Sequence, residues 1–280
     1  MKYQKPTFEI WEQESGLDGM YKHCERVSRV CYDSQDKSKN TVESGKDFVN
    51  RMMKSGHGEM LEHMTVYLTL NSDIPKCKGY ARLFKKNKYS YVHKDGHIYY
   101  VTTNYRVLLQ GSHKTFIKAF QNDYKSNWLD VLDYWTDPTE FHEIRKTVYM
   151  EIDRCTGESF IRHRVFSKAR QSTRACDYTK DKYEGITCIT PCWEVSPQAS
   201  MILDLALSAS ETYYAELRKL GWTAEQARIV LPFDIKSPLV MTGTVAEWKE
   251  FYDVRADGVV GRPHPQSVEI TEQIKKEMFK

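Results

Sequence analysis

The sequence lacks the short motifs that most often bind nucleotides or activate a nucleophile. No G-x-G-x-x-G motif opens a helix and no Walker A loop is present, so neither a Rossmann dinucleotide site nor a P-loop is indicated. The G-x-S-x-G nucleophile elbow is missing too, and His142-Glu143 has no second histidine at the spacing of a zinc protease. If the protein binds a nucleotide, side chains rather than a glycine-rich loop must hold it.

Long hydrophobic runs and a strong charge of one sign are also absent. Hydrophobic residues make up 40% of the 280 residues, and no apolar run approaches the ~20 residues of a membrane-spanning helix. The N-terminal stretch MKYQKPTFEIWEQE is charged and lacks the apolar segment of a secretory signal, so we expect a cytoplasmic protein without a membrane partner. A net charge of +3 is too small to indicate a nucleic-acid-binding protein, so any basic site must be local.

Cysteine pairing is not evident in the sequence. The seven cysteines are scattered through a chain that is too long to need disulfides for stability, which predicts free thiols in a reducing compartment. Cys188 and Cys192 lie four residues apart, but no second pair or histidine cluster stands beside them. We therefore expect no metal site.

Hydrophobic spacing predicts more helix than strand. We expect helices over residues 17–31, 44–54, 197–220, 224–231 and 263–280, and a helix with Val245, Trp248, Phe251 and Tyr252 that ends near Arg255. Thr223 and Gln226 have the spacing of a capping box. Strands are expected over residues 63–70 and 146–153. Without regular βαβ alternation, the pattern favours an α+β fold with an antiparallel or mixed sheet flanked by helices.

Two surface patterns accompany these elements. The long helix that begins at Pro197 is predicted to be amphipathic, with apolar residues at Ile202, Leu205, Ala209, Tyr213 and Leu217. Lysines, arginines and tyrosines interleave over residues 76–91, which could suggest RNA binding. A solvated basic hairpin is the interpretation we favour, so nucleic acid is not expected as a partner.

The segment from Arg162 to Arg174 is the richest in anion-binding groups. Arg162-His163-Arg164 is followed by seven residues and then by Ser172, with Arg174 close behind. Guanidinium groups bind phosphate in a planar, bidentate way, and a serine hydroxyl can donate to a phosphate oxygen. An isolated Arg-His-Arg triplet would be interpreted as a basic surface strand, but the spacing to Ser172 favours a phosphate site.

This segment resembles the signature of the flavin-dependent thymidylate synthases, the thymidylate synthase complementing protein type. Three further blocks are similar to segments of that family and occur in the same order. They are SGHGEMLEH at residues 55–63, QARIVLP at residues 226–232, and FYDVRAD at residues 251–257 followed by PHP around His264.

The resemblance implies a single α+β domain over residues 1–280 and a homotetramer with FAD bound where subunits meet. It also implies a reaction, the methylation of dUMP to dTMP, with methylenetetrahydrofolate as carbon donor and NADPH as reductant. The family uses no enzyme cysteine as nucleophile, so Cys176 is expected to pack rather than to react. His63 stays open between a buried structural residue and a ligand-side residue.

The resemblance also assigns roles to individual residues. Arg255 is the expected catalytic residue, because a buried, permanently charged guanidinium can stabilise negative charge that develops on the uracil ring. The expected dUMP contacts are Ser159, Arg162, Arg170, Gln171, Ser172, Thr173, Arg174, Arg228 and Arg255. The expected FAD contacts are His57, Glu59, Arg162, His163, Arg164, Thr244, Glu250 and His264.

The chain departs from the family pattern in three ways. Relatives usually carry an acid at or just before the matched serine and an aromatic residue after the matched arginine, where this chain has Arg170-Gln171 and Ala175. The segment between Arg162 and Arg174 thus holds five cations and no acid. A long insert also occupies residues 71–145. The changes at Arg170, Gln171 and Ala175 motivate one alternative, one-carbon transfer, such as hydroxymethylation, to another pyrimidine nucleotide. A non-catalytic nucleotide- or RNA-binding relative is the other alternative.

Overall fold

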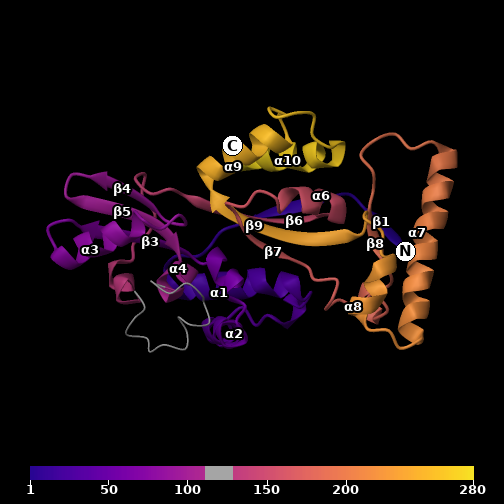
Figure 1. The fold of residues 1–280 in the computed structure, drawn as a ribbon, viewed down its shortest axis with the longest axis horizontal. Helices are drawn as coiled ribbons and strands as arrows, with labels where there is room; N and C mark the ends of the chain where they lie inside the picture. Colours follow the sequence, from indigo (N-terminus) through magenta and orange to yellow (C-terminus); the bar gives the residue numbers. More distant parts are fainter. Residues whose placement is uncertain (111–128) are drawn as a thin grey trace.

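A four-stranded antiparallel sheet forms the centre of the computed structural model, which describes residues 1–110 and 129–280 (Figure 1). In spatial order its strands are β2 (Thr7–Trp11), β6 (Arg145–Asp153), β9 (Lys236–Thr244) and β7 (Ser167–Arg170). The longest ladder joins β6 to β9, from Arg145 opposite Thr244 to Asp153 opposite Lys236. The predicted α+β class is confirmed.

Two smaller sheets and a set of helices complete the described residues. The antiparallel strands β3 (Thr65–Asn71), β5 (Ile98–Asn104) and β4 (Tyr91–Asp95) form one sheet, and the parallel pair β1 (Lys2–Gln4) and β8 (Thr187–Ile189) forms the other. The helices are α1 Gly16–Cys31, α2 Val42–Ser55, α3 Pro75–Phe84, α4 Tyr105–Gln110, α6 Arg154–Phe160, α7 Pro197–Lys219, α8 Ala224–Ala227, α9 Val245–Arg255 and α10 Pro265–Met278. Short 3-10 helices are η1 Gln35–Lys37, η2 Gly58–His63, η4 Leu129–Tyr134, η5 Asp181–Tyr183 and η6 Arg228–Val230.

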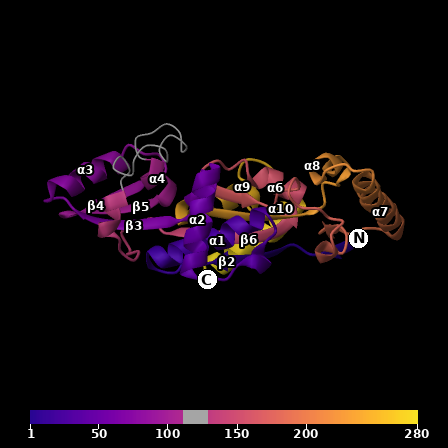
Figure 2. The same cartoon turned by 90° about the horizontal axis from the view of Figure 1, so that it is seen from below.

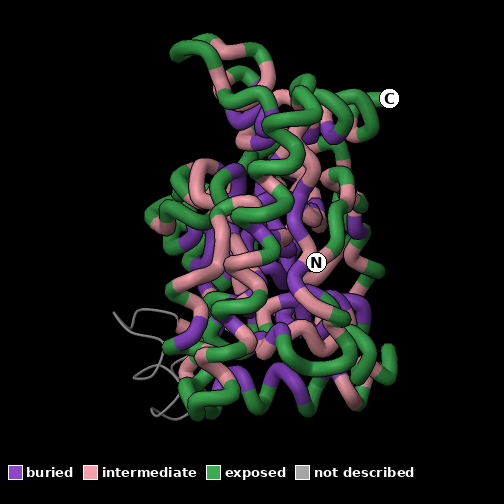
Figure 3. The backbone as a smooth tube through the Cα atoms, turned by 90° about the vertical axis from the view of Figure 1, so that its right-hand side faces the viewer, coloured by how far each residue is buried: buried purple, intermediate pink, exposed green. Residues whose placement is uncertain are grey.

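Helices cover both faces of the central sheet (Figures 1 and 2). Val148, Met150 and Ile152 of β6 are buried on the face that packs against α9 and α10. Tyr149 of the same strand packs on the opposite face, with the core that includes α1 and α2. This alternation follows from the period of two in a strand. Figure 3 shows the buried residues gathered in the middle of the molecule.

The predicted insert at residues 71–145 does not form a separate unit, because part of it shares a sheet with strand β3. Its strands β4 and β5 extend the sheet of β3, which precedes it. The expected basic hairpin is wrong for Lys76, Lys78 and Arg82, because they lie on helix α3, whose other face buries Cys77 and Phe84. Residues 111–128 of the insert lie outside the described residues.

Helix α7 is present as predicted, but its apolar stripe faces outward. Ile202, Leu205 and Tyr213 are 64%, 66% and 60% exposed, whereas the buried side carries Leu207 and Tyr214. The helix stands at one end of the molecule, and the sheet of β3, β5 and β4 lies at the other (Figure 1).

None of the helices within residues 1–110 and 129–280 combines the length and apolar character needed to cross a membrane.

A row of buried polar side chains lies on the face of the central sheet that packs against α1 and η2. His63 Nδ1 lies 2.7 Å from Thr242 Oγ1, which lies 2.8 Å from Thr147 Oγ1, and this hydroxyl in turn lies 3.2 Å from His23 Nε2. Both histidines are buried, and burial lowers the pKa of each, that of His23 to about 3. His63 is therefore a structural residue of the core, one of the two alternatives left open.

We expect the two buried histidines of this row to make the stability of the protein sensitive to acid. Because the pKa of His23 is lowered in the folded state, the unfolded protein takes up this proton first as the pH falls below about 6.5. The free energy of unfolding should then decrease by up to about 1.4 kcal/mol per pH unit, down to the folded pKa. Urea unfolding at several pH values measures this slope. His23→Gln should reduce it, and an unchanged slope would contradict the assignment.

Candidate active site

A cavity of about 410 Å³, cavity A, brings together residues from two predicted groups. His57 and Glu59, expected on the flavin side, line it together with Arg170, Ser172 and Arg174, expected on the nucleotide side. These residues are separated in the sequence by more than a hundred positions. Ala175, where relatives carry an aromatic residue, lines the same cavity.

Backbone hydrogen bonds hold the segment after β7 in this position. Gln171 N donates to Pro238 O of β9 at 2.8 Å, and Ser172 N donates to Cys31 O at the end of α1 at 2.9 Å. On the opposite wall, the Tyr32 hydroxyl and His57 Nδ1 lie 3.1 Å apart. The wall that carries Ser172 and Arg174 is thus attached both to the central sheet and to helix α1.

A second cavity of about 520 Å³, cavity B, shares Glu225 with cavity A. It is lined by Arg154, Thr173 and Arg228, and Arg228 Nη1 donates to Thr173 Oγ1 at 3.4 Å. On the rim, Arg174 Nε forms an ion pair with Glu225 Oε1 at 2.7 Å. Two adjoining cavities therefore contain three of the arginines predicted to bind the nucleotide, Arg170, Arg174 and Arg228.

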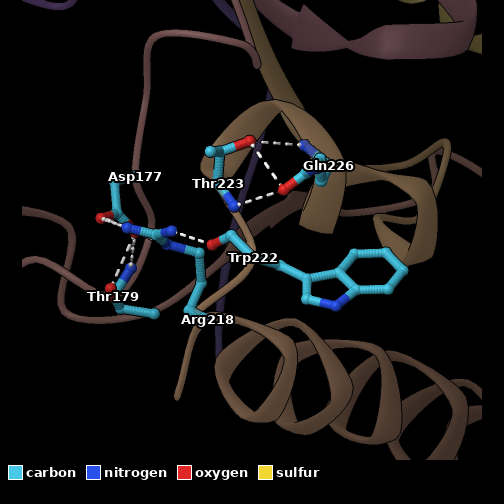
Figure 4. A network of polar contacts seen from close by, with 6 residues as sticks. All are labelled: Asp177, Thr179, Arg218, Trp222, Thr223 and Gln226. Carbon is cyan, nitrogen blue, oxygen red and sulfur yellow. Dashed lines mark hydrogen bonds and ion pairs between the residues drawn. The ribbon is translucent and has the colours of Figure 1, made fainter. Parts of the chain in front are cut away.

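A polar network positions the short helix α8 beside these cavities (Figure 4). Arg218 of α7 forms an ion pair with Asp177 at 2.8 Å and also donates to the carbonyl of Trp222. The hydrogen bond from Arg218 lowers the pKa of Asp177 to about 2. Thr223 and Gln226 then form the predicted capping box that opens α8. Because Arg228 follows this helix directly, the network fixes the position from which its side chain enters cavity B.

Arg255 is the centre of a second group of predicted residues, the Arg255 cluster, with Ser159, Arg162 and His163. Arg255 Nε donates to His163 Nε2 at 2.8 Å, and Nη2 donates to Ser159 O at 2.7 Å. Burial and the charge of Arg255 lower the pKa of His163 to about 4, so the ring is neutral and its Nε2 can accept. Arg162 lies close enough to lower the pKa of Arg255 further, after the effect of burial.

Lys168 holds the loop that carries the Arg-His-Arg triplet. Its Nζ donates to Ile161 O at 2.9 Å and to His163 O at 3.0 Å. Arg162 and Arg164 are exposed and contact no acceptor among the residues that the structure describes. Because Lys168 fixes the backbone of this loop and the guanidinium groups of Arg162 and Arg164 stay free, the loop suits an anionic ligand. Lys168 was expected only as one of the five cations of the arginine-rich segment.

Comparison with known proteins identifies the family. A family model described as "Thymidylate synthase complementing protein" matches residues 122–279, more than half of the chain. The chain belongs to this family. The resemblance inferred from the arginine-rich segment is thereby confirmed.

Three known proteins or structures are similar to this member of the thymidylate synthase complementing protein family at 14–25% identity. A "Flavin-dependent thymidylate synthase" of Pyrococcus abyssi (strain GE5 / Orsay) is 25% identical over 147 residues, which span 51% of this chain and 59% of the relative. Two crystal structures of the UMP/dUMP methylase PolB from Streptomyces cacaoi, bound with 5-Br dUMP and 5-Br UMP, have a TM-score of 0.47. They are 14% and 15% identical, and the matches cover 99% of this chain and 92% and 91% of theirs.

Four residues predicted for the site of this family member lie away from both groups. Thr244 is fully buried, and its hydroxyl accepts from Glu247 N at 3.1 Å to cap α9, so it is a structural residue in this chain. Glu250 is exposed on α9, and His264 begins α10 with its ring against Trp193. Gln171 is buried behind the wall of cavity A. The family resemblance assigned these four residues by matching sequence positions, which does not show where a side chain points.

Glu158 is a second supporting residue of this family member, beside Lys168, that the sequence did not predict. Its Oε1 lies 2.9 Å from Arg170 Nη2 and 3.5 Å from Arg154 Nη2. In the folded protein, helix α6 thus places a carboxylate beside Arg170 of the arginine-rich segment. Glu158 lies outside the arginine-rich motif, although its position four residues after Arg154 on a helix could have indicated the pairing.

Proposed function

We propose that this protein is a flavin-dependent thymidylate synthase that methylates dUMP to dTMP, with methylenetetrahydrofolate as carbon donor and NADPH as reductant. The observation that carries the proposal is cavity A, where His57 and Glu59 face Arg170, Ser172 and Arg174. Membership of the thymidylate synthase complementing protein family supports the same conclusion.

The phosphate of dUMP is proposed to bind where the two cavities adjoin. Ser172 and Arg174 line cavity A, and Thr173 and Arg228 line cavity B, so hydroxyl and guanidinium donors approach a common rim. Charge-assisted hydrogen bonds from guanidinium groups to phosphate are about twice as strong as neutral ones. In this arrangement the nucleotide replaces Glu225 as the partner of Arg174.

FAD is the proposed cofactor, and the residues present suit it. The free guanidinium groups of Arg162 and Arg164 can bind its phosphates. A reduced flavin supplies hydride chemistry that no side chain can perform. Arg255, whose Nε and Nη2 are engaged by His163 and Ser159, keeps Nη1 for a ligand. There its fixed charge can stabilise the negative charge that develops on the uracil ring.

A homotetramer is the proposed assembly, with FAD bound between subunits. The outward apolar side chains of α7, at Ile202, Leu205 and Tyr213, support burial of this helix against another copy. The two groups of site residues on one chain are also each open to solvent, with Arg162, Arg164 and Arg174 exposed. A light-scattering mass equal to one chain of 32.9 kDa would contradict this proposal.

Product analysis tests the proposed function directly. The purified protein should show a flavin absorbance spectrum and, with dUMP, methylenetetrahydrofolate and NADPH, should form dTMP as identified by mass spectrometry. A flavin-containing protein that oxidises NADPH but yields a hydroxymethylated nucleotide would support the alternative one-carbon transfer instead. A protein without flavin would support a non-catalytic relative.

A further inference from the structure

Helix α6 joins the two groups of site residues. Glu158 on this helix contacts Arg170 in the wall of cavity A, and the next residue, Ser159, accepts a hydrogen bond from Arg255. The helix is itself anchored, since Asp153 caps it by accepting from Thr156 N at 2.7 Å. A displacement of α6 would therefore move both groups together.

The contact between Glu158 and Arg170 is the attachment of α6 to the wall of cavity A. Among the described residues, Glu158 is the only acceptor that the Arg170 side chain contacts, and Arg170 Nη1 is buried without a partner. The Arg170 side chain is 19% exposed and that of Glu158 is 43% exposed, so water screens the pair only in part. Without Glu158, the guanidinium group of Arg170 would have no partner to fix its direction.

Glu158 also separates two like charges. Burial lowers the pKa of Arg154, the charge of Arg170 lowers it further, and the charge of Glu158 opposes both effects. One carboxylate oxygen therefore holds two guanidinium groups that would otherwise repel each other. Within the arginine-rich segment, Arg170 is thus neutralised by a carboxylate from outside the segment.

We propose that Glu158 and Arg170 form a positioning pair. The pair fixes the wall that carries Ser172 and Arg174 relative to helix α6, whose Ser159 accepts a hydrogen bond from Arg255. This inference rests on the proposed function. Arg170, expected from the motif to contact dUMP, then acts through Glu158 rather than on the nucleotide. Glu158 becomes a residue on which nucleotide affinity depends although it stands outside the matched motif.

Exchanging the two charges tests the pair. Glu158→Arg and Arg170→Glu should each raise the Kd for dUMP at least tenfold, measured by calorimetry on the flavin-loaded protein. The double variant Glu158→Arg/Arg170→Glu should return the Kd to within about threefold of wild type, because opposite charges face each other again. The same exchange at the ion pair of Glu12 and Lys146, which are 2.7 Å apart, is the control and should leave the Kd unchanged.

Each other result overturns the proposal. If only net charge mattered, Glu158→Arg would tighten dUMP binding and Arg170→Glu would weaken it. If Arg170 bound the phosphate itself, the double variant would stay as weak as Arg170→Glu. Glu158→Gln, which preserves the shape, covers the case in which a charged variant fails to fold, and an unchanged Kd for it would also refute the pair. A wild-type protein that binds flavin but not dUMP would refute the proposed function, and the pair's role with it.

Discussion

Replacing Arg255 with alanine should lower kcat for dTMP formation by about a hundredfold to a thousandfold, the usual effect of removing one preorganised group that stabilises transition-state charge. The guanidinium group is held by His163 and Ser159, so it needs no reorganisation when charge develops on the pyrimidine. Its removal also frees Nε2 of His163, which accepts from it in the intact protein. Steady-state rates with product analysis measure the effect.

Two controls show whether the loss comes from the charge or from its position. Arg255→Lys keeps a cation but lacks the planar fork with which Arg255 donates to both His163 and Ser159, so we expect it to recover only a small part of kcat. Lys249→Ala removes an exposed cation from the same helix and should leave kcat unchanged. A kcat within threefold of wild type for Arg255→Ala would place the catalytic cation elsewhere.

Arg174→Ala should weaken the binding free energy of dUMP by about 1.5–3 kcal/mol, because one charge-assisted hydrogen bond is lost. This loss corresponds to a Kd that is roughly 10- to 150-fold higher. Flavin absorbance should change little, because the free cations assigned to the cofactor, Arg162 and Arg164, are on another loop. Arg82→Ala on α3 is the control, since this exposed arginine lines neither cavity. An unaltered Kd for Arg174→Ala would move the phosphate site away from the rim shared by the cavities.

The sequence predicted the helices better than the strands. Periodic apolar residues and caps located α1, α2, α7, α8, α9 and α10, because these signals are local. Strand β9 was missed although it is central, since Pro238 within it cannot donate to a ladder and argues against a strand. In the structure Pro238 still accepts, from Gln171 N, on the side where β7 has ended.

The outward stripe of α7 shows what periodicity cannot decide. Ile202, Leu205 and Tyr213 have helical spacing, which predicts one apolar face but not what covers it. Within one chain the face is exposed, and Leu207 and Tyr214 supply the contacts to the core instead. A partner copy of the chain is information that the hydrophobic pattern of one chain does not contain.

The family resemblance proposed the arginines of the candidate site but not the residues that support them. The structure places Arg174 and Arg228 in cavities A and B, and Arg255 in a separate cluster with His163 and Ser159. Glu158 and Lys168 hold other site residues by contacts in space, an ion pair to Arg170 and hydrogen bonds to two loop carbonyls. Such contacts depend on how α6 packs beside β7, which local sequence does not specify.

The strand order of the central sheet also governs how the protein can be made. Strand β2 pairs with β6, and β6 pairs with β9, so more than two hundred residues separate the first strand of the sheet from the last one in the chain. At the usual rates of synthesis, β9 leaves the ribosome on the order of ten seconds or more after β2. Until then the edge of β6 that pairs with β9 has no partner. Contacts so distant in sequence predict slow folding, and nascent chains of this protein should depend on chaperones more than those of a helical bundle of equal length.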